Sequence, residues 1–333
     1  MDMEATGPAT VVVTYRGSDA FRHAIVEALG PAASVVFLAD LAPDDRTPAL
    51  DQADAVLAWN VDTELEAEEF GHLAGMGLIQ FVSAGADHVP FDRLPPEVPV
   101  ASNVGAYAAP MAEHVLAVAL ALSKRLPEQH AKLARGEFDQ RTLTRAIGGS
   151  VVGILGFGGI GQACAALFEA FGARIHAINR SGRTGRPVEF AGTLDDLDRV
   201  LAAADVLVIS IPLTRSTRGL IGRHELDTMK SDAILVNVAR GAIVDEAALY
   251  EHLRAHPEFS AGIDAWWDEP HAGEPFRTAF PFFDLPNLLG SPHNSALTRG
   301  SLVEANRYAA ANVLRHLRGE PFRGLVRRED YVG

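Results

Sequence analysis

The chain has very little cysteine and no long apolar run. Its single cysteine among 333 residues, Cys164, excludes an internal disulfide framework and a metal site built from several thiolates. Even the apolar run 115–122 is far shorter than the roughly 20 residues that span a bilayer. The opening residues 1–10 are acidic and small, without the basic and apolar pattern of a signal peptide. We therefore expect a cytoplasmic protein without a membrane span.

Positive charge is also scarce. The 29 lysines and arginines face 43 acidic residues, which gives a formal net charge of −14 at pH 7. Nucleic acids and anionic membranes require a basic face, so this balance argues against either as the main partner. A hydrophobic content of 48% is ordinary for a globular protein, and the length suffices for two domains.

The most informative motif is a glycine-rich loop between a strand and a helix. The apolar run 150–155 leads into Gly156-Phe-Gly158-Gly-Ile-Gly161, followed by the helical segment 162–171 and a second apolar run, 174–178. In such a βαβ unit the three glycines permit a tight turn, the approach of a pyrophosphate and helix packing. The free N–H groups of the helix then face the phosphates. The alternative is a glycine turn in an ordinary α/β protein.

Short apolar runs alternate with helical segments along most of the chain. The other candidate strands are 11–15, 35–38, 55–59, 79–82, 99–101, 206–211, 234–238, 262–265 and 288–289. Helices are predicted at 19–29 after Ser18, at 110–126, at 246–255 after Asp245, and at 300–318. This alternation predicts an α/β fold of two doubly wound parallel-sheet domains, the second with about six strands.

Three of the later strands end in functional groups. The stretches are Asn237-Val-Ala-Arg240-Gly241, Asp264-Ala-Trp-Trp-Asp-Glu269-Pro270 and Ser291-Pro-His293-Asn294. The carboxyl ends of parallel strands line the ligand crevice of an open sheet, so an Arg, a Glu and a His are expected to meet there. Taken singly, each has a plain alternative: a surface arginine, a solvated loop acid or a packed loop histidine.

Together with the glycine loop, these stretches resemble the D-isomer-specific 2-hydroxyacid dehydrogenases. The further stretches that carry the resemblance are Ile211-Pro-Leu-Thr214, Pro292-His293, Ser83-Ala-Gly-Ala-Asp-His88, Asn103 and Ala112-Glu-His114. The resemblance covers nearly the whole chain. It implies a flavodoxin-like substrate-binding domain, residues 1–103 plus 296–333, interrupted by a Rossmann cofactor domain, residues 104–295. It also implies a homodimer built through the cofactor domain and the arm 127–147.

The resemblance assigns roles that suit the residue types. His293 would give a proton to the carbonyl oxygen of a 2-keto acid, and Glu269 would bond the other ring nitrogen. Arg240 offers a planar fork for the substrate carboxylate. The backbone N–H groups of Ala84, Gly85 and Ala86 would complete the substrate cradle. No metal is expected, and the implied cofactor contacts are Gly156, Gly158, Gly159, Ile160, Gly161, Asn179, Arg180, Ser181, Arg183, Pro212, Thr217, Val238, Ala239 and Asp264, the last at the nicotinamide carboxamide.

Some positions depart from parts of the family. Members that oxidise formate carry Gln in place of Glu269, and those that oxidise phosphite carry Lys at the position we align with Ala86, so both substrates are disfavoured. The tandem Trp266-Trp267 stands where members carry Val-Phe or a similar pair. It is interpreted either as packing under the site loop or as a wall that restricts substrate size.

The end of the second strand of the βαβ unit indicates which cofactor is preferred. Sites that prefer NAD place Asp or Glu there to bind the ribose 2′-OH. This chain has Asn179, followed by Arg180, Ser181 and Arg183, so no carboxylate at this position repels a 2′-phosphate and the arginines can bind it. We predict a preference for NADP(H), with NAD as the alternative cofactor. The competing interpretation is that these arginines only decorate a loop.

The leading hypothesis is therefore an NADPH-dependent 2-ketoacid reductase, with glyoxylate or hydroxypyruvate as candidate substrates. A hypothesis from another class is a dinucleotide-sensing binding protein, like the corepressors that share this fold. We favour it less because the tail after Arg318 is short. A phosphoglycerate-type dehydrogenase is also less favoured, since the substrate loop has no obvious phosphate-binding cluster and we expect no regulatory domain after Gly333. The expected partners are a small acid and a second copy of the chain.

Overall fold

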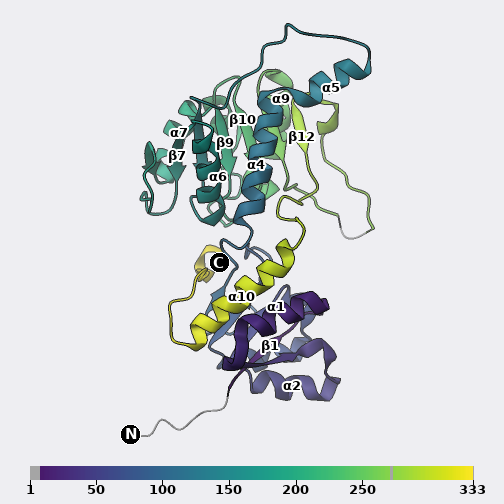
Figure 1. Cartoon of the computed structure of the whole chain (residues 1–333), viewed down its shortest axis with the longest axis vertical. Helices are drawn as coiled ribbons and strands as arrows, with labels where there is room; N and C mark the ends of the chain where they lie inside the picture. Colours follow the sequence, from purple (N-terminus) through teal and green to yellow (C-terminus); the bar gives the residue numbers. More distant parts are fainter. Residues whose placement is uncertain (1–7, 271–272, 333) are drawn as a thin grey trace. The chain divides into compact units, whose positions relative to one another are not determined.

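The computed structural model describes residues 8–270 and 273–332, which form two α/β units (Figure 1). One unit extends to Tyr107 and resumes at Thr298, and the other is Ala108–Leu297. The domain boundaries predicted from the sequence lie after residues 103 and 295. Each unit has its own parallel sheet, one of five strands and one of seven. The predicted fold class, two α/β domains with parallel sheets, is confirmed.

The interrupted unit contains a sheet in the order β2-β1-β3-β4-β5, the flavodoxin-like order. Its strands are β1 (Ala9–Val13), β2 (Ala33–Phe37), β3 (Ala55–Ala58), β4 (Leu78–Phe81) and β5 (Val100–Ala101). The first two begin earlier than predicted because Ala9 and Thr10 pair with Ala33 and Ser34. These small residues carry no strong apolar signal, so only the ladder shows that they belong to strands.

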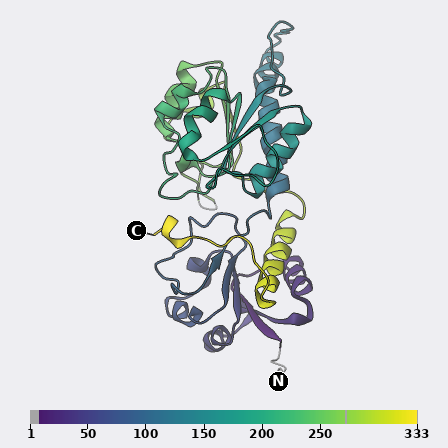
Figure 2. The same ribbon diagram turned by 90° about the vertical axis from the view of Figure 1, so that its left-hand side faces the viewer.

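Two helices cover one face of this sheet. Helix α1 (Asp19–Leu29) begins after Ser18, whose hydroxyl accepts from the N–H of Phe21, as predicted. Helix α10 (Ser301–Leu317) lies beside it, and Figures 1 and 2 both show the pair. Asn103 ties this helix to the sheet, because its side-chain amide donates to the carbonyls of Val82 and Ala305. The remaining helices of the unit are α2 (Pro43–Asp51) and the short α3 (Val61–Glu64).

The second unit contains a seven-stranded sheet in the order β12-β11-β10-β9-β6-β7-β8. Its strands are β6 (Val151–Leu155), β7 (Arg174–Ile178), β8 (Phe190–Gly192), β9 (Val206–Ile209), β10 (Ile234–Asn237), β11 (Ser260–Ile263) and β12 (Leu288–Gly290). The expectation of about six strands missed β8. This edge strand has three residues and pairs only with β7, so it lacks an apolar run that the sequence could reveal.

Helices cover both faces of the larger sheet (Figure 2). They are α4 (Ala108–Ser123), α5 (Leu126–Ala134), α6 (Gly159–Ala170), α7 (Leu197–Ala203), α8 (Arg223–Thr228) and α9 (Glu246–Ala255), with α4 against α6. The predicted helix 110–126 is wrong at its end. Helix α4 stops at Ser123, and Arg125, with a left-handed φ of 51°, is the N-cap of α5, which has Pro127 in its first turn. Asp245 caps α9 as predicted, accepting from the Ala248 N–H.

All strands of the larger sheet are parallel, so the loops after them meet at one edge. Gly156 follows β6, Asn179 follows β7, and the functional groups of the later loops follow β10, β11 and β12. The fold therefore brings the predicted cofactor and catalytic residues of this unit to the same edge. None of the described helices has both the length and the apolar character needed to cross a bilayer.

Candidate active site

The glycine loop has the geometry that a dinucleotide requires. Gly156 has a φ of +95°, and a Cβ there would lie 2.7 Å from the backbone N of Ile211. A Cβ at Gly161 would collide with the carbonyl oxygen of Gly156, whereas one at Gly158 would meet no protein atom within 4 Å. The first and third glycines are therefore required by the fold, and the second leaves open space in front of the helix.

Helix α6 starts in that open space. Gly158 is its N-cap and provides no side chain to bond the first N–H groups, which belong to Gly159, Ile160 and Gly161. These donors have no partner within the helix, and the helix dipole makes this end partly positive. The space and the donors fit the pyrophosphate of a dinucleotide.

The loop after β7 is organised by Asn179. Its side-chain oxygen accepts from the N–H of Ser181 at 2.9 Å and from the Ser181 hydroxyl at 3.0 Å, and its amide donates to the Arg183 carbonyl at 2.7 Å. The side chains of Arg180 and Arg183 are exposed. The guanidinium of Arg186 pairs with Glu169 on α6.

The predicted contacts Pro212 and Thr217 belong to one turn after β9. The Thr217 hydroxyl donates to the Pro212 carbonyl at 2.7 Å and accepts from the N–H of Thr214 at 2.8 Å. Ser210, just before this turn, donates to the Gly156 carbonyl at 2.9 Å. The turn is therefore joined to the glycine loop.

Arg240 is held by the residues around it in the motif. The buried Asn237 donates to the Arg240 carbonyl at 2.9 Å and accepts from the Ala239 N–H at 3.0 Å, while Val238 donates to Ile209. The guanidinium donates to the Ala239 carbonyl at 2.7 Å. This anchoring role of Asn237 was not predicted, although an amide at the end of an apolar strand is a signal that could have indicated it.

His293 and Glu269 form a close pair. The Nδ1 atom of His293 lies 2.7 Å from Oε2 and 2.9 Å from Oε1 of Glu269. Burial opposes ionisation of this carboxyl, but the bond to His293 and the Trp266 N–H outweigh it and hold the pKa of Glu269 below its usual range. Because Nδ1 is engaged, Nε2 is the nitrogen that can face a substrate. The pairing expected from the sequence is present in the structure.

The backbone of His293 is unusual. Its φ is +48°, a left-handed conformation that few non-glycine residues adopt, and its N–H donates to the Asp264 carbonyl at 2.9 Å. Such conformations cost about 1–3 kcal/mol and persist where the surroundings enforce them, often at functional sites. Nothing in the local sequence predicts this conformation.

Asp264 anchors the loop that carries His293. Its side chain is only 1% exposed, and its oxygens accept from the Ser291 hydroxyl at 2.6 Å and from the N–H groups of Asn294 and Ser295, each at 3.1 Å. Burial opposes ionisation, yet these bonds hold the pKa of Asp264 below its ordinary value. This anchoring role was missed in the sequence analysis. The predicted contact with the nicotinamide carboxamide stays a prediction.

Replacing Asp264 by Asn is expected to lower the free energy of unfolding at pH 7 by about 1.5–3 kcal/mol, because ionic hydrogen bonds are lost. The folded pKa lies below the unfolded one, so the stabilisation is present above the unfolded value and is lost as the pH falls through the folded value. Urea unfolding at neutral and acid pH measures this. The gap between wild type and variant should shrink in acid, and a constant gap would contradict the assignment. Asp198→Asn, at a side chain 66% exposed, is the control.

The predicted substrate loop lies after β4, in the other unit. The Ser83 hydroxyl donates to the Gly85 carbonyl at 3.0 Å, and Nε2 of His88 lies 3.2 Å from the carbonyl oxygen of Trp59. Ala86 is buried, while Ala84 and Gly85 are half-buried. These bonds give the loop a defined shape, and its part in substrate binding stays a prediction.

Trp266 and Trp267 are both packed. Each indole N–H donates to a backbone carbonyl, that of Ser291 at 2.8 Å and that of Val244 at 2.6 Å respectively. Trp266 also lines a cavity of about 420 Å³. The other residues around this cavity are Glu269, Pro270, Phe276, Phe283, Gly290, Ser291, Pro292 and His293. The packing role is therefore present in the structure, and the restriction of substrate size stays a prediction.

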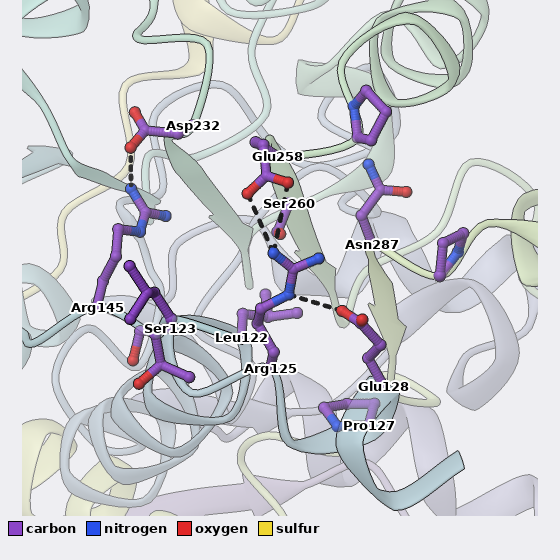
Figure 3. Close-up of a pocket in the computed structure, with 14 residues that line it drawn as sticks. Leu122, Ser123, Arg125, Pro127, Glu128, Arg145, Asp232, Glu258, Ser260 and Asn287 are labelled. Carbon is purple, nitrogen blue, oxygen red and sulfur yellow. Dashed lines mark hydrogen bonds and ion pairs between the residues drawn. The ribbon is translucent and has the colours of Figure 1, made fainter. Parts of the chain in front are cut away.

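A different cavity, of about 250 Å³, lies where β10 and β11 begin, at the opposite edge of the sheet (Figure 3). Arg125 pairs there with Glu128 and Glu258, and Arg145 pairs with Asp232. The glycine loop, Arg240 and His293 do not line it. Part of its wall comes from the arm 127–147, and we do not assign it to the reaction.

Cys164 has no chemical role in this site. It is fully buried in α6, and burial raises the pKa of its thiol to about 12, so the reactive thiolate is suppressed. Within the residues that the structure describes, no group of three or more His, Cys, Asp or Glu side chains is arranged to hold a metal ion.

Comparison with characterised proteins places this geometry in a family. Residues 116–295 match the model of the D-isomer specific 2-hydroxyacid dehydrogenase, NAD binding domain. A D-3-phosphoglycerate dehydrogenase of Archaeoglobus fulgidus is 28% identical over 79% of this chain, and the match spans 50% of that protein. A glyoxylate reductase of Thermococcus gammatolerans is 33% identical over 63% of the chain and 64% of its own length. A hydroxypyruvate reductase of Thermotoga maritima is 30% identical over 73% of this chain and 78% of its own length.

The chain thus spans about half the length of the first of these relatives. Among solved structures, a candidate formate dehydrogenase from Pyrobaculum aerophilum is 28% identical, with a TM-score of 0.80 over 96% of this chain and 99% of that one. A D-isomer specific 2-hydroxyacid dehydrogenase from Xanthobacter autotrophicus, solved with NADPH and MES, is 26% identical. Its TM-score is 0.77 over 98% of this chain and 100% of that one. The chain belongs to the D-isomer-specific 2-hydroxyacid dehydrogenase family.

Proposed function

We propose that this protein reduces a 2-keto acid to the D-2-hydroxy acid with a nicotinamide dinucleotide, and that glyoxylate and hydroxypyruvate are its candidate substrates. The observation that carries the proposal is the pair of His293 and Glu269, 2.7 Å apart at the sheet edge that also bears the glycine loop and Arg240. The names of the glyoxylate and hydroxypyruvate reductases among the relatives support the choice of substrates.

The residues divide the chemistry among them. Arg240 binds the substrate carboxylate with its planar fork and orients the adjacent carbonyl. A nicotinamide dinucleotide held by the glycine loop would supply the hydride for C2. His293 gives the Nε2 proton to the carbonyl oxygen, which becomes the hydroxyl, and the Glu269 carboxylate stabilises the imidazolium before transfer.

The test is turnover with a panel of keto acids. Purified protein is mixed with NADPH or NADH and with glyoxylate, hydroxypyruvate, pyruvate, phenylpyruvate, 2-ketoisocaproate or 3-phosphohydroxypyruvate, and loss of the reduced cofactor is followed. The proposal expects turnover with at least one unphosphorylated acid. If the smallest acids give the highest kcat/KM, this result supports the interpretation of Trp266 as a wall that restricts substrate size. Binding of NADPH without turnover of any acid would instead support the dinucleotide sensor.

A second candidate is phosphoglycerate dehydrogenase activity, favoured by the name of the Archaeoglobus relative. The predicted substrate loop, Ser83-Ala-Gly-Ala-Asp-His88, contains no Lys or Arg for a phosphate. We therefore rank this activity below reduction of the small acids. A kcat/KM for 3-phosphohydroxypyruvate above that for hydroxypyruvate would reverse the order.

We also propose NADP(H) as the preferred cofactor, supported by Asn179 and by the exposed Arg180 and Arg183. Replacing both arginines by Ala should lower kcat/KM for NADPH by about 10- to 100-fold, the effect of losing ionic hydrogen bonds to a 2′-phosphate. The value for NADH should change little. Initial rates with varied cofactor measure both, and an unchanged NADPH/NADH ratio would refute the assignment. Arg186→Ala is the control, because that arginine lies outside the predicted cofactor contacts and its guanidinium pairs with Glu169 on α6.

Assembly and location remain part of the proposal. We propose a cytoplasmic homodimer in which the arm 127–147 contacts a second copy. The side chains of Phe138 and Leu143 in this arm are 78% and 89% exposed, which is costly for large apolar groups in water. Light scattering measures the molar mass of the wild type and of the double variant that carries Phe138→Ser and Leu143→Ser. A monomeric wild type would contradict the proposal.

A further inference from the structure

Trp266 contacts each of the three chain segments that carry Arg240, Glu269 and His293. It lies in the loop after β11 and is only 7% exposed. Two of these contacts are hydrogen bonds, and two are close approaches at glycines. The mechanism proposed above gives this residue no part.

The first hydrogen bond holds the carboxylate of the pair. The backbone N–H of Trp266 donates to Oε1 of Glu269 at 2.9 Å. The same oxygen lies 2.9 Å from Nδ1 of His293, and Oε2 lies 2.7 Å from it. The bond therefore restricts the rotation of the carboxylate and keeps both oxygens facing the imidazole.

The second hydrogen bond holds the loop of the histidine. The indole Nε1–H of Trp266 donates to the carbonyl of Ser291 at 2.8 Å, two residues before His293. The ring also lies over Gly290, where a Cβ would be 2.7 Å from the Cζ2 atom of the indole. This contact fixes the chain as it enters the left-handed conformation of His293, whose φ is +48°.

The remaining approach concerns the arginine. A Cβ at Gly241, the residue after Arg240, would collide with the carbonyl group of Trp266. The backbone that follows Arg240 is therefore packed directly on the peptide between Trp266 and the next residue. The indole itself is held in place by Phe276 and Phe283, whose ring centroids lie 4.9 Å and 5.5 Å from it.

We propose that Trp266 is a positioning residue for the reaction. Its indole N–H holds the His293 loop and its backbone N–H holds Glu269, so that Nδ1 of the histidine stays paired and Nε2 keeps its direction. This inference rests on the proposed function. Phenylalanine at this position keeps an aromatic ring and the backbone N–H but leaves the Ser291 carbonyl without the indole donor.

The test compares Trp266→Phe with Trp267→Phe. Trp267 is a close match, since its indole also donates to a backbone carbonyl and its ring stacks on Phe282 with centroids 5.4 Å apart. Both variants should lose similar thermal stability. Only Trp266→Phe should lower kcat, by about 10- to 100-fold as expected for a misplaced catalytic group, with little change in either KM. Equal kcat values for the two variants, or a loss confined to KM, would overturn the proposal.

A readout independent of turnover separates this inference from the proposed function. A proton between Nδ1 of His293 and Glu269 should give a downfield NMR resonance, assigned by its loss in His293→Asn. Trp266→Phe should shift or broaden this resonance, whereas Trp267→Phe should leave it in place. A wild type inactive toward every keto acid would refute the function, and the NMR comparison would still decide the positioning role. An unchanged resonance in Trp266→Phe would refute that role.

Discussion

Replacing His293 by Asn is expected to lower kcat for 2-keto acid reduction by about 10²- to 10⁴-fold, the usual contribution of a general acid. The amide cannot release a proton to the developing alkoxide. Binding of NADPH should be unchanged, because the glycine loop and the loop after β7 lie on other strands of the sheet. Steady-state rates and fluorescence titration with NADPH measure the two quantities.

Two further variants make this prediction specific. His224→Asn is the control, because that side chain lies on α8 and is 71% exposed. It should retain wild-type kcat. Glu269→Gln should lower kcat less than His293→Asn, since the amide still occupies the site beside Nδ1 but no longer carries a charge. If His293→Asn kept more than a tenth of wild-type kcat, another group would have to supply the proton.

Arg240→Lys is expected to lower kcat/KM for the keto acid by about 100-fold, mainly through KM. Lysine keeps the positive charge but cannot reproduce the planar fork that holds a carboxylate by two parallel hydrogen bonds. The lost ionic hydrogen bond is worth about 1.5–3 kcal/mol, which corresponds to this factor. Rates at varied keto acid and saturating NADPH give the value.

The control for this prediction is Arg254→Lys on α9, at a side chain that is 62% exposed. It should leave both kcat and KM unchanged. Binding of oxamate or another unreactive 2-keto acid analogue should weaken in Arg240→Lys by the same factor as KM rises. A loss in kcat with an unchanged KM would mean that Arg240 acts on the reacting carbonyl rather than on the carboxylate.

Much of the site could be predicted because its signals are local in the sequence. Gly156 and Gly161 sit between an apolar run and a helix, and the structure shows why side chains are excluded at both positions. His293 and Glu269 are far apart in the chain, yet each follows a strand of one parallel sheet. Since the carboxyl ends of parallel strands share an edge, their meeting could be expected from order alone.

Other features could not be predicted, because they depend on contacts between distant segments. The strand β8 exists through its ladder with β7, and the helix expected to reach 126 stops where Arg125 turns left-handed. Neither event changes the local apolar pattern. The loop after β7 is likewise organised by side-chain bonds of Asn179 that composition does not reveal.

The sequence by itself determined the fold class, the glycine loop and the residue types that reach the sheet edge, because these follow from apolar periodicity and from strand order. Only the tertiary structure decided how those residues are held. Asp264 anchors the loop of His293, and Trp266 contacts the segments that carry Arg240, Glu269 and His293. Such support comes from buried hydrogen bonds and close backbone approaches between segments remote in the chain, which no local pattern records.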